Sequence, residues 1–210
     1  MTEQILTFDN VSKNFEKIRA LENVNISVEH GEFLALVGPS GCGKSTILRI
    51  ASGLDYPSFG TINTSTKKIG YVFQDSTLMP WRTVRKNVEL LAELEKIDKE
   101  SIKKKADDII ELVGLQDFAD HYPIALSGGM KMRASLARSL VLEPELFLFD
   151  EPFGALDLIT RGRLNVELMQ LYNSKNFTSL FVTHSVEEAS VSYTHLRAHE
   201  TLRYLVCRLL

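Results

Sequence analysis

The sequence has 210 residues, a formal net charge of −3 and 44% hydrophobic residues. This length suits one large domain with a sizeable core, and the charge balance lacks the basic excess typical of nucleic-acid-binding proteins. The two cysteines, Cys42 and Cys207, give no disulfide framework and favour a cytosolic setting. We expect no signal peptide and no membrane span, because no suitable apolar run is present. A membrane role would therefore need a partner protein.

The first third of the chain predicts strands and one helix. The run Phe33-Leu34-Ala35-Leu36-Val37 is typical of a buried strand, and a glycine-rich stretch follows it at once. The expected strands cover residues 3–9, 22–29, 33–37 and 71–73, and the helix covers about 43–53.

The middle of the chain changes to helical spacing, with apolar positions three and four residues apart and charged outer faces. Strands alternating with helices then return, which predicts a largely parallel sheet covered by helices on both faces. The expected helices lie near residues 84–91, 102–113, 127–142 and 158–171, and the strands at 146–149 and 180–182.

Residues 38–45, Gly-Pro-Ser-Gly-Cys-Gly-Lys-Ser, fit the phosphate-binding loop pattern between a strand and a helix. Glycines let the backbone wrap around phosphate oxygens, and the helix N-terminus adds its positive dipole end. Lys44 is predicted to reach the β- and γ-phosphates, and Ser45 to bind Mg²⁺. The other predicted cofactor-binding residues of this loop are Gly38, Ser40, Gly41, Cys42, Gly43 and Thr46.

The apolar run Leu146–Asp150 matches the second nucleotide-binding motif. A buried strand would deliver Asp150 to the coordination sphere of the metal, through a water molecule. Glu151, the next residue, could orient and deprotonate an attacking water. Taken alone, an Asp-Glu pair after a strand could equally cap a helix or lie on the surface, so its weight comes from the other motifs.

The segment Leu126-Ser127-Gly128-Gly129-Met130, called the signature segment below, distinguishes this chain from other phosphate-binding ATPases. With it, residues 4–190 resemble the nucleotide-binding domain of ABC transporters. The resemblance implies that Ser127, Gly128 and Gly129 contact the γ-phosphate of ATP held by a second copy. Met130 departs from the glutamine most common in the family.

Four further positions match the pattern of the family. Phe15 corresponds to an aromatic that stacks on adenine, although it could simply be a core residue. Gln74 corresponds to the Q-loop residue that touches Mg²⁺ and the attacking water. Asp157, in Gly154-Ala155-Leu156-Asp157, corresponds to the D-loop facing the second copy. His184 corresponds to the switch histidine on the γ-phosphate, whereas a lone histidine is usually structural.

The resemblance therefore implies an ATPase that uses ATP and Mg²⁺. Its implied fold is an α/β P-loop NTPase (RecA-like) core with a small antiparallel β region near the N-terminus and an inserted α-helical subdomain. We expect the core at 1–74 and 141–190 and the helical subdomain, with the signature motif, at 75–140. The implied catalytic residues are Glu151, His184 and Gln74, and the implied metal ligands are Ser45, Gln74 and Asp150.

Residues 73–84 are similar to those of bacterial importers of nitrate, sulfonate, taurine and related small solutes. That similarity implies a peripheral subunit at the cytoplasmic face of the cell (inner) membrane. Its partners would be a second copy of itself, separate permease subunits and, indirectly, a solute-binding protein, with no nucleic acid. Trp81 is the expected permease contact, although it could instead belong to the core of the helical subdomain.

Other ATPase classes fit the sequence less well. ABC ATPases of chromosome maintenance carry long insertions that do not fit in this length, and translation factors carry two sets of motifs. A P-loop kinase with a chance signature would give no reason for Gln74, Asp157 and His184 to follow in the expected order.

Residues 191–210 match one reading frame of a common transposase sequencing adapter, with a short sample index near residues 202–203. The alternative is a natural amphipathic C-terminal helix. We expect a truncated chain of about 190 residues that lacks the later strands and helices of the family, with an uncovered sheet edge. The alternative function is then an inactive fragment that binds ATP without completing the cassette.

Overall fold

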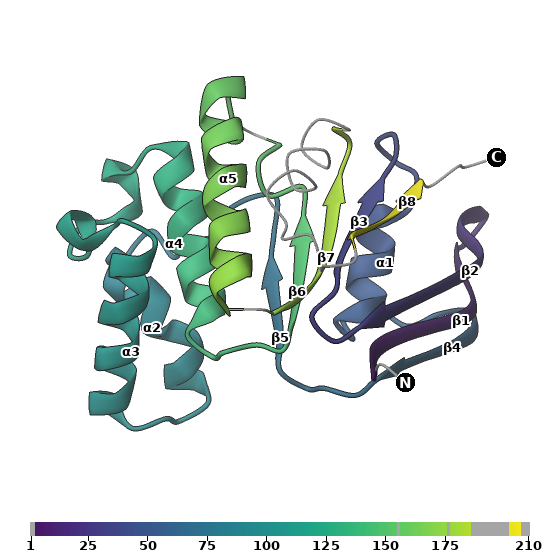
Figure 1. Ribbon diagram of the computed structural model, residues 1–210, viewed down its shortest axis with the longest axis horizontal. Helices are drawn as coiled ribbons and strands as arrows, with labels where there is room; N and C mark the ends of the chain where they lie inside the picture. Colours follow the sequence, from purple (N-terminus) through teal and green to yellow (C-terminus); the bar gives the residue numbers. More distant parts are fainter. Residues whose placement is uncertain (1–2, 155, 176, 186–201, 207–210) are drawn as a thin grey trace.

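The structure is a computed structural model that describes residues 3–154, 156–175, 177–185 and 202–206. Its described strands form two sheets (Figure 1). The parallel sheet has the order β5 (Ile69–Val72), β6 (Leu146–Asp150), β7 (Thr178–Thr183), β3 (Phe33–Val37) and β8 (Leu202–Val206). The antiparallel sheet has the order β2 (Ile18–Glu29), β1 (Gln4–Phe15) and β4 (Phe59–Thr64).

The central strands β3, β6 and β7 are buried on both faces. This burial explains their near-continuous apolar sequences, as expected for parallel strands covered by helices. The carboxyl ends of all three meet at one edge of the sheet, where ligands bind in open α/β folds. The residues that follow Val37, Phe149 and Thr183 are therefore brought to the same edge.

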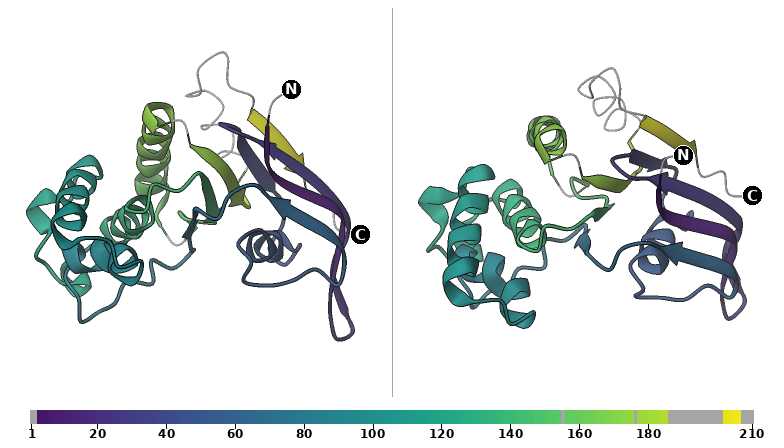
Figure 2. Two further views of the ribbon diagram at one scale, coloured as in Figure 1. Left: turned by 90° about the horizontal axis from the view of Figure 1, so that it is seen from below. Right: turned by 60° about the horizontal axis from the view of Figure 1, so that its bottom comes forward.

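Helix α1 (Lys44–Ala51) lies between the two sheets (Figure 2). Its buried face, with Ile47 and Leu48, packs against Leu148 and Val182 of the parallel sheet and also against the antiparallel sheet. Helix α5 (Leu158–Lys175) covers the opposite face of the parallel sheet (Figure 1).

The remaining helices gather beyond the β5 edge of the parallel sheet (Figure 2). They are α2 (Val84–Leu94), α3 (Lys99–Leu112), the short 3₁₀ turns η1 (Gln116–Phe118) and η2 (Pro123–Ala125), and α4 (Gly128–Leu140). Thr83, Asp98 and Ser127 cap the three α-helices by accepting backbone N–H bonds. None of the helices in the described ranges is long and apolar enough to cross a membrane.

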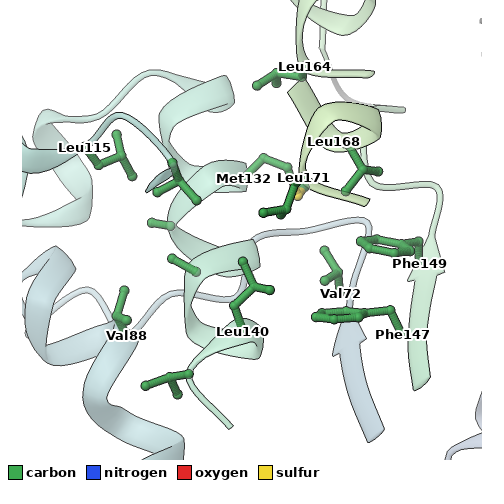
Figure 3. Close-up of a cluster of buried hydrophobic side chains, with 14 of the residues drawn as sticks. Val72, Val88, Leu115, Met132, Leu140, Phe147, Phe149, Leu164, Leu168 and Leu171 are labelled. Atoms are coloured by element: carbon green, nitrogen blue, oxygen red, sulfur yellow. The ribbon is translucent and has the colours of Figure 1, made fainter. Parts of the chain in front are cut away.

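One hydrophobic core joins these helices to the parallel sheet (Figure 3). Met132 of α4 and Leu171 of α5 point toward each other, above Val72 and Phe149 of the sheet. The signature helix and the helix after the D-loop are therefore packed as neighbours.

The two sheets and the group of helices confirm the predicted fold class. The strand β4 was not predicted, because its sequence is largely polar and exposed and only its pairing with β1 defines it. Strands β1 and β2 are longer than predicted, since their hairpin extends to Phe15 and Ile18.

We expected an uncovered sheet edge, and among the described strands the edge beyond β3 is formed by β8. Leu202–Val206 form β8, which pairs in parallel with Phe33–Val37. Tyrosine and valine in this run favour a strand, and the backbone of β3 offers hydrogen-bonding groups to it. Residues 186–201 and 207–210, which include the rest of the predicted adapter-derived tail, lie outside the described residues.

Candidate functional site

The loop between β3 and α1 has a backbone that requires glycine at two positions. Gly41 and Gly43 have φ angles of 83° and 89°, in the left-handed region that disfavours other residues. A Cβ atom on Gly43 would lie 2.5 Å from the carbonyl oxygen of Ala20. Within the described residues, no side chain caps the N-terminus of α1. Its first N–H groups therefore suit an anionic ligand such as a phosphate.

The remaining loop residues differ in how far they face solvent. Cys42 and Lys44 are buried, Gly38 and Thr46 are half-buried, and Ser40 and Ser45 are exposed.

Lys44 places its ammonium group inside this loop. Its Nζ atom donates to the carbonyl oxygens of Gly38 at 2.8 Å and Pro39 at 2.9 Å, and lies 3.6 Å from Glu151 Oε1. Only 3% of its surface is exposed. The loop and the end of β6 therefore share one buried positive charge.

Asp150 stands at the carboxyl end of β6 with both carboxylate oxygens hydrogen-bonded. Ser45 Oγ donates to Oδ1 at 2.8 Å, and Tyr71 Oη donates to Oδ2 at 3.2 Å. Burial raises the pKa of Asp150, while the two hydrogen bonds oppose that rise. Burial, with the nearby charge of Asp150, raises the pKa of Tyr71 above its usual range, so its hydroxyl remains a donor.

Glu151 and His184 meet next to this aspartate. His184 Nδ1 lies 3.0 Å from Glu151 Oε2, and the Glu151 backbone N–H donates to Val182 O at 3.0 Å. Glu151 has a φ angle of 45°, which is uncommon for a residue with a side chain. Strained backbone of this kind is concentrated at functional sites, where the surrounding structure holds it.

Gln74 lies close to the same carboxylate across Gly154. A Cβ atom on Gly154 would lie 3.4 Å from Gln74 Nε2 and 3.6 Å from Glu151 Oε2. The structure thus brings together six predicted site residues, namely Lys44, Ser45, Gln74, Asp150, Glu151 and His184.

The signature residues Ser127, Gly128 and Gly129 make a separate set of contacts at the start of α4. Ser127 Oγ accepts a bond from Met130 N at 3.3 Å, which caps α4. A Cβ atom on Gly128 would lie 3.0 Å from Leu156, and one on Gly129 would lie 3.0 Å from Thr160. Gly128 and Gly129 therefore lie against Leu156 and the first turn of α5, and Ser127 and Gly128 are exposed.

Asp157 and Phe15 occupy two further positions outside the group around Lys44. Asp157 Oδ1 accepts the Thr160 N–H at 3.0 Å, and this bond holds the pKa of Asp157 below its usual range. Phe15 is 44% exposed at the tip of the β1–β2 hairpin. Lys13 Nζ lies 4.9 Å from the centroid of its ring.

The donor set around Asp150 fits a magnesium ion. Ser45 and Asp150 offer a hydroxyl and a carboxylate oxygen, and oxygen donors are those that Mg²⁺ prefers. Among the described residues, no group of three or more His, Cys, Asp or Glu side chains could hold a metal by itself. Mg²⁺ is typically held by one or two carboxylates together with substrate phosphates.

Two residues of this region carry contacts that sequence reasoning missed. Tyr71 contacts Asp150, and no local sequence pattern indicated this, because the contact depends on β5 and β6 being neighbours in the sheet. Arg138 of α4 donates to Ser76 O, Thr77 O and Thr77 Oγ1, just after Gln74. Nothing in the local pattern separates Arg138 from a solvent-exposed helix arginine.

A phosphate loop after β3 and an Asp-Glu pair at the carboxyl end of β6, joined by Lys44, define a P-loop nucleotide hydrolase. Residues 21–154 match the family model described as "ABC transporter". The chain therefore belongs to the ABC transporter family, and as a member of it the chain binds ATP and is an ATPase.

Several relatives are similar over most of their length. The chain is 47% identical to an uncharacterized ABC transporter ATP-binding protein of Methanocaldococcus jannaschii, over 88% of this chain and 73% of the relative. It is 44% identical to an aliphatic sulfonates import ATP-binding protein of Bacillus licheniformis, over 82% of this chain and 69% of the relative. Its structure is similar to the dimeric ABC transporter cassette MJ0796, with a TM-score of 0.81 at 32% identity, over 96% and 94% of the two chains.

Proposed function

We propose that this chain is the ATP-hydrolysing subunit of an ABC importer. It would power uptake of a small solute of the nitrate, sulfonate or taurine type through separate permease subunits, at the cytoplasmic face of the cell membrane. The observation that carries the hydrolytic role is the Glu151 carboxylate, held between Lys44 at 3.6 Å and His184 at 3.0 Å. The similarity to an aliphatic sulfonates import ATP-binding protein supports the importer role.

In this proposal the phosphate loop binds ATP, and its buried lysine contacts the phosphates. Glu151 accepts the proton of the attacking water, and Gln74 and His184 orient the water and the γ-phosphate. Lys44 leaves the carbonyl oxygens of Gly38 and Pro39 when phosphate oxygens take their place. The positive charges and N–H groups around the phosphates then stabilise the charge that develops during transfer.

Mg²⁺ would be held by Ser45, Gln74 and Asp150 together with the phosphates, and when bound it neutralises phosphate charge.

We further propose that two copies enclose two ATP molecules, with Phe15 against adenine. Each site would use the phosphate loop of one copy and Ser127, Gly128 and Gly129 of the other. The exposure of Ser127 and Gly128 supports this arrangement. Leu158 and Ile159 also support the two-copy arrangement, because these apolar residues directly follow Asp157 and are 72% and 85% exposed. The similarity to a dimeric ABC transporter cassette points the same way.

The hydrolytic role is tested by phosphate release from the wild type and from Glu151→Gln. The variant keeps the side-chain shape but cannot accept the proton. We expect it to bind ATP and to hydrolyse it at least about a hundredfold more slowly, the scale typical of losing a general base. Near-normal turnover would remove Glu151 from its role. ATP binding without hydrolysis in the wild type would favour the inactive fragment.

We propose that the region around Trp81 contacts the permease. Trp81 is 72% exposed, which argues against its being part of the core, and exposed aromatics are enriched at interfaces. The test is permease co-purification and transport-coupled ATPase activity of Trp81→Ala. Tyr56→Ala is the matched control, because Tyr56 is 77% exposed and lies on a different part of the chain. Equal permease recovery from both variants would contradict the contact.

We propose the domain division given by the sequence, with residues 75–140 as the helical subdomain of a single nucleotide-binding domain spanning 1–190. The grouping of α2, α3 and α4 beyond β5 supports it (Figure 2).

We also propose that residues 191–210 derive from adapter sequence. Strand β8 does not argue against this origin, because strand addition depends mainly on backbone hydrogen bonds that many sequences can supply. Long-read sequencing of the source DNA through codon 190 tests the origin. A different continuation is expected, and the same codons in the genomic reads would contradict it.

A further inference from the structure

Tyr71 and Asp150 are brought together by the period-two alternation of two neighbouring strands. β5 and β6 pair in parallel, with Tyr71 opposite Leu148. Alternate residues of a strand share one face of the sheet, so Asp150 lies on the same face as Leu148 and Tyr71. That face is the one covered by α1, whose Ile47 and Leu48 pack in the same cluster. The first turn of α1 also carries Ser45.

The carboxylate of Asp150 is therefore held from two sides. Ser45 Oγ lies 2.8 Å from Oδ1, and Tyr71 Oη lies 3.2 Å from Oδ2. A single donor would leave the carboxylate plane free to turn, whereas two donors on different oxygens fix its orientation. In the proposed function Ser45 is itself a metal ligand. Its bond to Asp150 would then change when the ion binds, and the bond from Tyr71 would remain.

The position of Tyr71 is fixed by contacts of its ring and its backbone. Its ring stacks on Phe73, with the centroids 4.1 Å apart and the planes 21° from parallel. Its backbone oxygen accepts a bond from Ser139 Oγ of α4 at 3.1 Å. The hydroxyl group is thus fixed by the sheet, by an aromatic neighbour and by the signature helix.

We propose that Tyr71 is a positioning residue that orients the Asp150 carboxylate toward the Mg²⁺ of bound nucleotide. The inference rests on the proposed magnesium site. Groups that orient metal ligands in this way typically contribute 10- to 100-fold to metal affinity or activity. Tyr71 touches neither the nucleotide nor the attacking water in this role.

The test is Tyr71→Phe, which removes only the hydroxyl group and keeps the ring that stacks on Phe73. Mn²⁺ is the probe, because the electron paramagnetic resonance signal of the free ion measures binding without turnover. With saturating ADP, we expect the Mn²⁺ dissociation constant of Tyr71→Phe to rise about tenfold over the wild type. Binding of ADP in the presence of a chelator should be unchanged. ATPase activity should need more Mg²⁺ for its half-maximal rate but recover toward wild type when Mg²⁺ is saturating.

Tyr122→Phe is the matched control, because this tyrosine is 51% exposed and lies just before η2, outside the site. It should bind Mn²⁺ like the wild type. An unchanged dissociation constant for Tyr71→Phe would overturn the inference. So would an equal loss of ADP affinity with and without metal, because that result indicates a packing role. If the wild type itself binds no Mn²⁺ with ADP, the proposed magnesium site fails, which is a different outcome from failure of Tyr71 alone.

Discussion

Arg138 holds the segment after Gln74 against the signature helix, and replacing it should loosen both. Its guanidinium group donates to Ser76 O at 3.1 Å, and to the carbonyl oxygen and Oγ1 of Thr77 at 2.9 Å each. Thr77 has a φ angle of 46°, so the bonds hold a backbone conformation that threonine rarely adopts. Only 7% of the Arg138 surface is exposed.

The expected loss in the free energy of unfolding for Arg138→Met can be estimated from these contacts. The three partly buried hydrogen bonds to Ser76 and Thr77, at about 1 kcal/mol each, give about 3 kcal/mol, and the longer 3.4 Å bond to Ser135 Oγ is lost as well. The substitution also removes the cost of burying the charge, a cost that is apparent in the lowered pKa of Arg138. Methionine refills most of the apolar volume. The expected loss in the free energy of unfolding is therefore about 2 kcal/mol.

Urea denaturation of Arg138→Met measures this loss, and hydrogen exchange should show faster exchange at residues 76–78. The matched control is Arg163→Met, because that side chain is 74% exposed and pairs with Glu167 on the surface at 2.9 Å. Its loss should stay below about 0.5 kcal/mol. If the two variants lose equal stability and exchange in residues 76–78 is unchanged, Arg138 does not hold this segment.

Two further predictions concern the phosphate loop and the antiparallel sheet. Gly43→Ala should abolish measurable ATP binding, because its Cβ would lie 2.5 Å from Ala20 O at a φ of 89°. Isothermal titration calorimetry measures this binding, and wild-type affinity of the variant would contradict the prediction. Asp55 pairs with Lys13 at 2.6 Å, and this bond lowers the pKa of Asp55. The resulting stability is present above the unfolded pKa of Asp55 and is lost as pH falls through the folded value. Asp55→Asn should therefore lower the urea midpoint at pH 7 more than at pH 3, and equal effects at both pH values would refute the assignment.

The parallel sheet and the phosphate loop could be predicted because their signals are local. Phe33–Val37 and Leu146–Phe149 are apolar runs of strand length, and each is followed by residues of defined chemistry. Since parallel strands end at one edge, the motifs that follow them had to converge. The group formed by Lys44, Asp150 and Glu151 follows from that rule.

Other features depend on contacts between distant segments, which no local pattern encodes. β4 is a polar, exposed strand that exists through its pairing with β1. The bond from Tyr71 to Asp150 requires that β5 and β6 be neighbours, and that order is a property of the folded sheet. The pairing of β8 with β3 likewise brings residues from opposite ends of the chain together.

Light scattering of the Glu151→Gln variant tests whether ATP joins two copies of this chain. Because the variant should bind ATP without consuming it, the joined state should accumulate. We expect a monomer without nucleotide or with ADP, and a dimer with ATP. A variant that is saturated with ATP and remains a monomer would contradict the shared site formed by the phosphate loop and the signature segment.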